Sequence, residues 1–89
     1  PGLIDAHVHA LGVAREDALR FGVTTVLDLF GDPAQLPVAR AERESLAPTL
    51  QADLWGAGYL ATAAGGHGTQ FGLPVPTLAS AAEAPAWVA

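Results

Sequence analysis

The 89-residue sequence contains no cysteine, which excludes disulfide bonds and thiolate chemistry but fits any cellular compartment. Lysine is also missing, and four arginines stand against nine acidic residues, for a formal net charge of −5. Because there is no basic patch to neutralise phosphates, we expect no nucleic-acid partner. Long apolar runs are missing too, since each is interrupted before the roughly 18 residues that a membrane-spanning helix needs. We therefore expect no membrane-embedded segment.

The residues that are present indicate a globular chain, because 51% are hydrophobic and only 15% are charged. The length fits one small domain with a thin core. The chain has no methionine and begins at Pro1 within an apparent motif, so we interpret it as a fragment, or a domain cut from a longer protein. No segment resembles a signal peptide. We leave the compartment open, with the cytoplasm favoured.

Two histidines, His7 and His9, lie at the end of the opening run over residues 1–9, a short apolar segment. In a strand this spacing places both side chains on one face, about 6.5 Å apart along the chain. Apolar residues on both faces predict a buried parallel strand, and α/β proteins place their chemistry at the C-terminal ends of such strands. Neutral imidazole is a common zinc ligand, so the pair is a candidate metal site. The alternative is two histidines that make ordinary hydrogen bonds near a strand end.

The rest of the chain alternates predicted strands and helices, which favours βα units with a parallel sheet and right-handed crossovers. Gly22 is expected to end the first helix, and Asp32 and Pro33 to begin the second. Asp28, near the C-terminal end of its strand, is expected to cap the next turn or to pair with an arginine. The alternative is that it contacts a ligand or the groups around one. The expected helices cover residues 15–21, 33–44 and 80–88, the last beginning with a capping box at Ser80 and Glu83, and the further strands cover residues 23–29 and 52–64.

A glycine-rich loop over residues 65–76 follows the third predicted strand. Long ordered loops at strand ends are often functional, and four glycines would allow this one to close over a substrate. His67, Thr69 and Gln70 are its candidate substrate-binding residues. In the alternative interpretation the loop is a connector in which His67 only bonds to backbone.

Three motifs together resemble a known family. The run PGLIDAHVH over residues 1–9 closely resembles the first-strand signature of the amidohydrolase superfamily, metal-dependent hydrolases built on a distorted (β/α)8 barrel. FGVTTVLD over residues 21–28 is similar to the second strand of that family. GGHG over residues 65–68 is similar to its subgroup related to imidazolonepropionases and Xaa-Pro dipeptidases. One departure is Leu27, at a position where the subgroup often has Arg.

The resemblance implies an α/β fold in which residues 1–89 are the N-terminal fragment of the catalytic domain, the first three βα units of a (β/α)8 TIM-type barrel. It implies that His7 and His9 bind one or two divalent metal ions, with zinc favoured. A carboxylated Lys, further His residues and an Asp general base are expected beyond residue 89. Asp5 is expected either to support the histidines or to make a hydrogen bond at the strand start.

The function implied is hydrolysis of amide or cyclic amide C–N bonds, in a small-molecule or peptide-like substrate, by metal-activated water. The 89 residues alone are expected to be inactive and, with exposed sheet edges, unstable or self-associating, and a homo-oligomer is among the expected assemblies. Two alternatives stay open. One is a non-catalytic truncated barrel segment, and the other is a small metal-binding module that uses His7, His9 and His67 as ligands.

Overall fold

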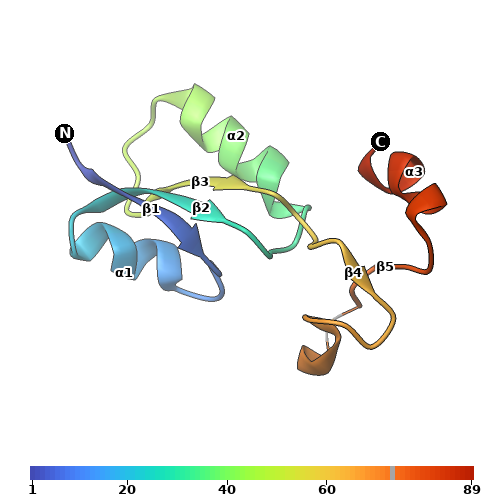
Figure 1. Cartoon of the computed structure of the whole chain (residues 1–89). Helices are drawn as coiled ribbons and strands as arrows, with labels where there is room; N and C mark the ends of the chain where they lie inside the picture. Colours follow the sequence, from blue (N-terminus) through green and yellow to red (C-terminus); the bar gives the residue numbers. More distant parts are fainter. Residues whose placement is uncertain (73) are drawn as a thin grey trace. The chain divides into compact units, whose positions relative to one another are not determined.

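The computed structural model describes residues 1–72 and 74–89, which form two compact units, Pro1–Gly58 and Tyr59–Ala89 (Figure 1). Residue 73, which falls within the loop predicted over residues 65–76, lies outside the described residues. Within the described ranges, no helix has the length and apolar character needed to cross a membrane.

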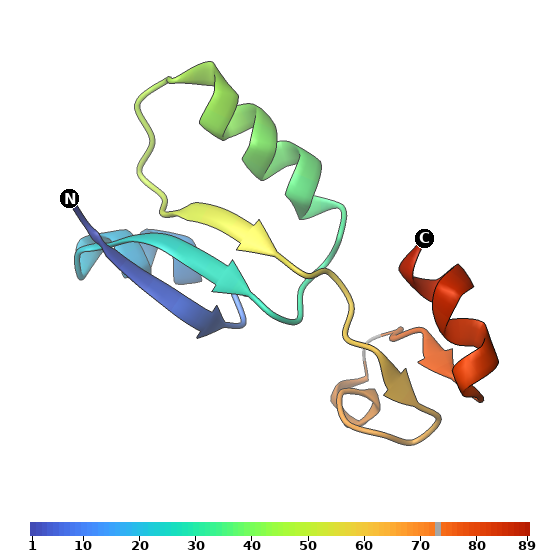
Figure 2. The same cartoon turned by 45° about the horizontal axis from the view of Figure 1, so that its top comes forward.

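The first unit is a parallel three-stranded sheet in the order β1-β2-β3, with a helix in each connection (Figure 2). Val26 in the central strand pairs with Asp5 on one side and Leu54 on the other. The predicted helix–strand alternation is confirmed for this unit. Its elements are β1 (Leu3–Val8), α1 (Ala14–Arg20), β2 (Val23–Asp28), α2 (Gln35–Ser45) and β3 (Asp53–Gly56).

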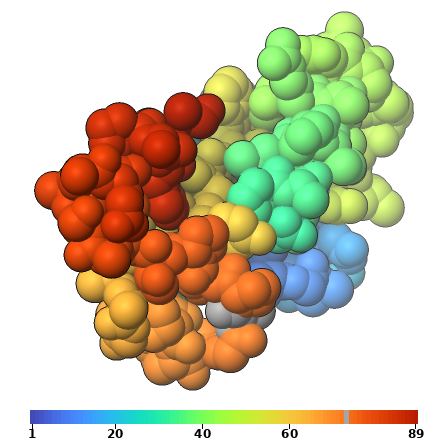
Figure 3. Space-filling view, turned by 90° about the vertical axis from the view of Figure 1, so that its right-hand side faces the viewer, coloured from blue at the N-terminus to red at the C-terminus, as the bar shows by residue number. Residues whose placement is uncertain are grey.

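The core of this unit is small. Its buried apolar side chains are Ala10, Val26, Phe30, Ala39, Ala52 and Leu54. The strand β1 lies at the edge of the sheet, and five of its six residues are exposed. The prediction that this strand is buried on both faces is therefore wrong, because little of this small unit packs against its faces. Helix α2 buries only Ala39, and its outer surface is open in the space-filling view (Figure 3).

Helix α1 ends as its sequence predicts, with Gly22 at φ +85°, a left-handed conformation that favours glycine. Arg15 in this helix anchors it to the segment before β3. The carbonyl of Arg15 accepts the N–H of Ala52 at 2.9 Å, and the Arg15 Nε donates to the Ala52 carbonyl at 2.9 Å. The same guanidinium contacts Glu42 of α2 at 2.8 Å, so one side chain joins both helices and the segment before β3.

Helix α2 begins two residues later than predicted. Asp32 accepts the N–H of Ala34 at 2.9 Å, which forms a turn ahead of the helix, and Gln35 is the first helical residue. Asp32 therefore stabilises the turn and is not the N-cap. The predicted third strand, residues 52–64, is also wrong as one element. It ends at Gly56, and Gly58 takes φ +76°, so the chain leaves the sheet there.

The second unit contains short elements only. Its two-residue strands pair in parallel, and the predicted helix at residues 80–88 begins as a 3-10 turn. In place of the capping box, the Glu83 carboxylate accepts the N–H of Ala79 and the hydroxyl of Ser80. The elements are β4 (Thr62–Ala63), η1 (Thr69–Phe71), β5 (Thr77–Leu78), η2 (Ala81–Glu83) and α3 (Ala84–Val88).

These observations correct the predicted fold class. The chain is α/β, but it does not form the first three βα units of a (β/α)8 TIM-type barrel. Two βα units and a third strand form the first sheet. Residues 57–72 continue as a loop, a two-residue strand and a 3-10 turn, where the rest of the third strand and a loop were expected. The apolar residues after Gly56 resemble a continuing strand in sequence. The last backbone bond to β2 is from the Ala57 N–H to the Asp28 carbonyl, and Thr62–Ala63 pair with β5 instead.

Candidate functional site

The two histidines lie at the C-terminal end of β1, and both are exposed. Their ring centroids are 5.8 Å apart with an interplanar angle of 82°. The pairing of β1 with β2 shifts between Asp5 and Val8, so the strand is irregular just where the histidines begin. Asp5 bridges this irregularity, because its carboxylate accepts the His7 N–H at 3.1 Å. Asp5 therefore supports the backbone of His7.

His9 lies beside the turn that follows β2. Its ring is 6.0 Å from that of Phe30, edge to face at 84°, and Phe30 is buried. Asp28, only 5% exposed, accepts the Phe30 N–H at 2.9 Å and the Ala10 N–H at 3.1 Å. The prediction that Asp28 caps the next turn is confirmed by the first bond. Sequence analysis missed the second, which joins residues 18 positions apart.

The separation of the two rings fits binding to one metal ion. A zinc–nitrogen bond of about 2.0–2.1 Å places a ring centroid roughly 3.2 Å from the ion, so two imidazoles on one tetrahedral ion lie about 5 Å apart, and no more than about 6.4 Å. The observed 5.8 Å is wider than the tetrahedral value and within the upper limit, and it is also an ordinary separation for an edge-to-face pair of rings, about 4.5–7 Å. In the described part of the chain, no group of three or more His, Cys, Asp or Glu side chains surrounds a metal position. The pair thus offers two ligands.

The three residues predicted to bind substrate lie together in the second unit. The Gln70 side-chain oxygen accepts the Gly68 N–H at 2.7 Å, and its nitrogen lies 3.4 Å from His67 Nδ1. The Thr69 hydroxyl donates to the Gly66 carbonyl at 2.8 Å. His67 and Gln70 are exposed, and their mutual contacts give the loop a defined local shape. A role in substrate binding stays a prediction.

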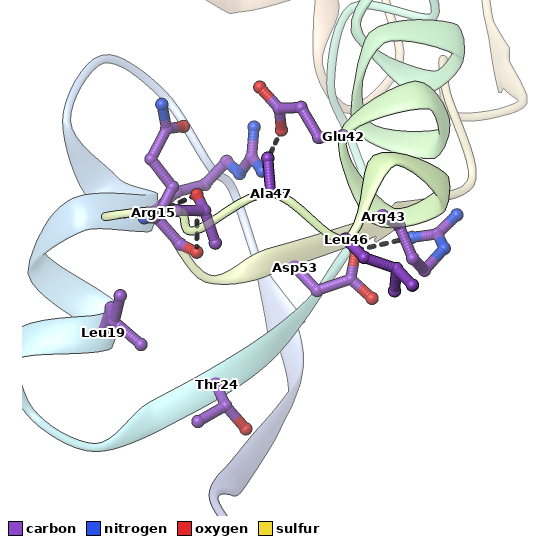
Figure 4. A pocket seen from close by; sticks show the side chains of 10 residues that line it. Arg15, Leu19, Thr24, Glu42, Arg43, Leu46, Ala47 and Asp53 are labelled. Atoms are coloured by element: carbon purple, nitrogen blue, oxygen red, sulfur yellow. Dashed lines mark hydrogen bonds and ion pairs between the residues drawn. The ribbon is translucent and has the colours of Figure 1, made fainter.

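A cavity of about 340 Å³ is lined by residues of helices α1 and α2 and of the N-terminal ends of β2 and β3 (Figure 4). Thr24 near the start of β2 and Asp53 at the start of β3 line it, whereas His7 and His9 lie at the C-terminal end of β1. Its two arginines already pair with acidic side chains, Arg15 with Glu42 and Arg43 with Asp53. The remaining lining residues are Leu19, Leu46, Ala47, Thr49 and Gln51. Sequence analysis did not identify this cavity, because its walls come from separate elements.

Comparison of the chain with models of protein families, with curated proteins and with solved structures found no match. The resemblance to the amidohydrolase superfamily therefore rests on the three sequence motifs and stays a prediction. The separation of the His7 and His9 rings is independent of these motifs, and it bears only on metal binding by the two histidines.

Proposed function

We propose that this chain contributes His7 and His9 as ligands for a divalent metal ion, zinc in the first place, in a hydrolase that cleaves amide or cyclic amide C–N bonds. The observation that carries the proposal is the 5.8 Å separation of two exposed imidazole rings at the C-terminal end of a parallel strand. Parallel α/β sheets bind their ligands at that end. The PGLIDAHVH motif supports the choice of hydrolase chemistry.

Each imidazole would bind through a neutral ring nitrogen, so neither histidine acts as the general acid or base. When bound, the ion would polarise the scissile carbonyl and lower the pKa of a bound water. The carboxylate of Asp5 holds the His7 backbone, and the ring of Phe30 contacts His9, so both ligands have support from within this unit. Two ligands leave positions on the ion for other donors, for water and for substrate.

Zinc calorimetry on the 89-residue chain tests the ligand assignment. We expect binding weaker than that of a complete site, lost in His7→Ala and in His9→Ala and unchanged in His67→Ala, the matched control. Unchanged binding in the first two variants would contradict the proposal. Loss of binding in His67→Ala would instead favour a three-histidine metal module.

Hydrolase activity is tested in the natural gene product that contains this chain, against a panel of amide and cyclic amide substrates. We expect zinc-dependent hydrolysis that falls at least about 100-fold in His7→Ala and in His9→Ala, since loss of a ligand to the ion removes the activated water. Activity that is insensitive to chelator and to both substitutions would overturn the hydrolase assignment.

A further inference from the structure

We propose that Asp28 is the positioning residue for His9, an inference that rests on the proposed metal site. Asp28 is the only buried charged residue among the described residues, and its carboxylate contacts no basic side chain there. Its two oxygens accept the backbone N–H groups of Ala10, which follows His9, and of Phe30, whose ring contacts His9. A buried carboxylate is costly unless such bonds satisfy it, so its place at this point of the sheet calls for a specific role.

Asp28 joins the ends of all three strands of the sheet. Its Oδ2 accepts the N–H of Ala10, the residue after His9, at 3.1 Å. Its Oδ1 accepts the N–H of Phe30 at 2.9 Å, and its backbone carbonyl accepts the N–H of Ala57, just after β3, at 2.9 Å. The chain leaving β1 is thereby fixed to the turn after β2 at the level of His9.

These bonds act on His9 from two directions. The Ala10 bond fixes the backbone on the C-terminal side of His9, and the Phe30 bond fixes the backbone of the residue whose ring contacts the His9 ring at 6.0 Å. Both bonds end on one rigid carboxylate group. Loss of that carboxylate would loosen the chain after His9 and the aromatic ring beside it together. The bond from the Leu11 N–H to the His9 carbonyl and the bond from Asp5 to the His7 backbone would stay.

The substitution Asp28→Asn tests this role, with Asp32→Asn as its matched control. Both remove one negative charge and keep the side-chain shape, and Asp32 also accepts a backbone N–H two residues ahead, but it bonds only to Ala34. An amide offers one acceptor oxygen, so Asp28→Asn can keep only one of its two bonds. We expect the zinc dissociation constant to rise about tenfold in Asp28→Asn, as for other residues that orient metal ligands, and to stay within about twofold in Asp32→Asn.

NMR of the imidazole rings separates positioning from general stability. In Asp28→Asn we expect the zinc-induced shift of His9 to weaken while that of His7 remains, with the folded fraction checked by urea unfolding. In the metal-free chain, the nuclear Overhauser effect between the His9 and Phe30 rings should be present in the wild type and in Asp32→Asn and lost in Asp28→Asn. This measurement needs no zinc.

Phe30→Leu provides a second variant if Asp28→Asn does not fold, because it keeps the backbone N–H and removes only the ring beside His9. Phe30→Leu should weaken zinc binding, and only the zinc-induced NMR shift of His9 should decrease. Equal effects of Asp28→Asn and Asp32→Asn, or a retained ring contact in Asp28→Asn, would overturn the positioning role. Zinc binding that is insensitive to His7→Ala and His9→Ala would refute the metal site instead, and the metal-free ring contact would still decide whether Asp28 orients His9.

Discussion

Gly31 leaves the space that the carboxylate of Asp28 occupies. A Cβ atom built on Gly31 would lie 2.4 Å from Asp28 Oδ2 and 2.9 Å from its Cγ, closer than such atoms approach. The Gly31 N–H also donates to the Gly58 carbonyl at 3.1 Å, which limits how far the backbone can move away. A side chain at position 31 must therefore displace the carboxylate that fixes Ala10 and Phe30.

We expect Gly31→Ala to lower the free energy of unfolding by about 1–3 kcal/mol, the usual range for an added methyl group in a tightly packed site. Urea unfolding followed by circular dichroism measures it. Gly12→Ala is the control, because its Cβ meets no atom within 4 Å and its φ of +58° alone should cost about 1 kcal/mol. A loss in Gly31→Ala no larger than in the control would show that the Asp28 carboxylate moves freely.

The charged residues of α2 show how far side-chain roles follow from local sequence. Arg40 and Glu44 form the exposed i,i+4 pair that their spacing predicts, at 2.8 Å. Arg43 is on the same helix, but it donates to Asp53 at 2.5 Å and its Cζ lies 4.0 Å from the Trp55 ring centroid. The position of Arg43 in the helix does not predict these contacts, because they depend on β3 lying beside the helix.

The C-terminal end of helix α2 is strained. Leu46, the C-cap residue, has φ 55° and is the one described residue other than glycine with a positive φ. Its side chain is 91% exposed, so little burial compensates the left-handed backbone. Glycine is the usual residue where a helix ends in this conformation.

We expect Leu46→Gly to raise the free energy of unfolding by about 1 kcal/mol, because it removes the left-handed strain and loses almost no buried surface. Thermal and urea unfolding measure the change. Leu50→Gly serves as the control, since Leu50 is 86% exposed and has no positive φ, and it should be neutral or slightly destabilising. A decrease in stability for Leu46→Gly would mean that its side chain makes contacts that matter in solution.

Local signals predicted the elements whose ends are marked by single residues. Gly22 ended α1, and the β-branched residues of Val23–Asp28 marked β2. The third predicted strand failed because apolar residues continue past Gly56, whereas strand pairing is set by distant partners. The same distinction between local and long-range features holds for the candidate site. The spacing of His7 and His9 was readable, but the bond from Ala10 to Asp28 depends on the pairing of β1 with β2.

At the scale of the whole molecule, exposed apolar surface is the dominant feature. Twelve large hydrophobic side chains of the described residues are exposed, and Ile4 on the edge strand β1 is 66% exposed. The outer edge of β1 pairs with no strand in the described sheet. Such an edge, with unpaired backbone groups and apolar side chains, favours association with other chains.

We expect the chain to self-associate at high concentration, and Ile4→Lys to reduce this association by placing a charge on the free edge. Sedimentation velocity over a concentration series measures the average mass. Leu50→Lys makes the same charge change at an exposed position outside the strands and should have a smaller effect. Equal reductions in both variants would indicate a general effect of net charge, and the β1 edge would then not be the contact.

The two hydrogen bonds between Arg15 and Ala52 determine how the first unit opens. These residues are 37 positions apart, and their backbone and side-chain bonds fix α1 to the chain entering β3. Neither segment can detach while the other stays in place. The amides at the start of α1 and β3 should therefore exchange with deuterium through one shared opening, and local fraying of α1 alone should contribute little.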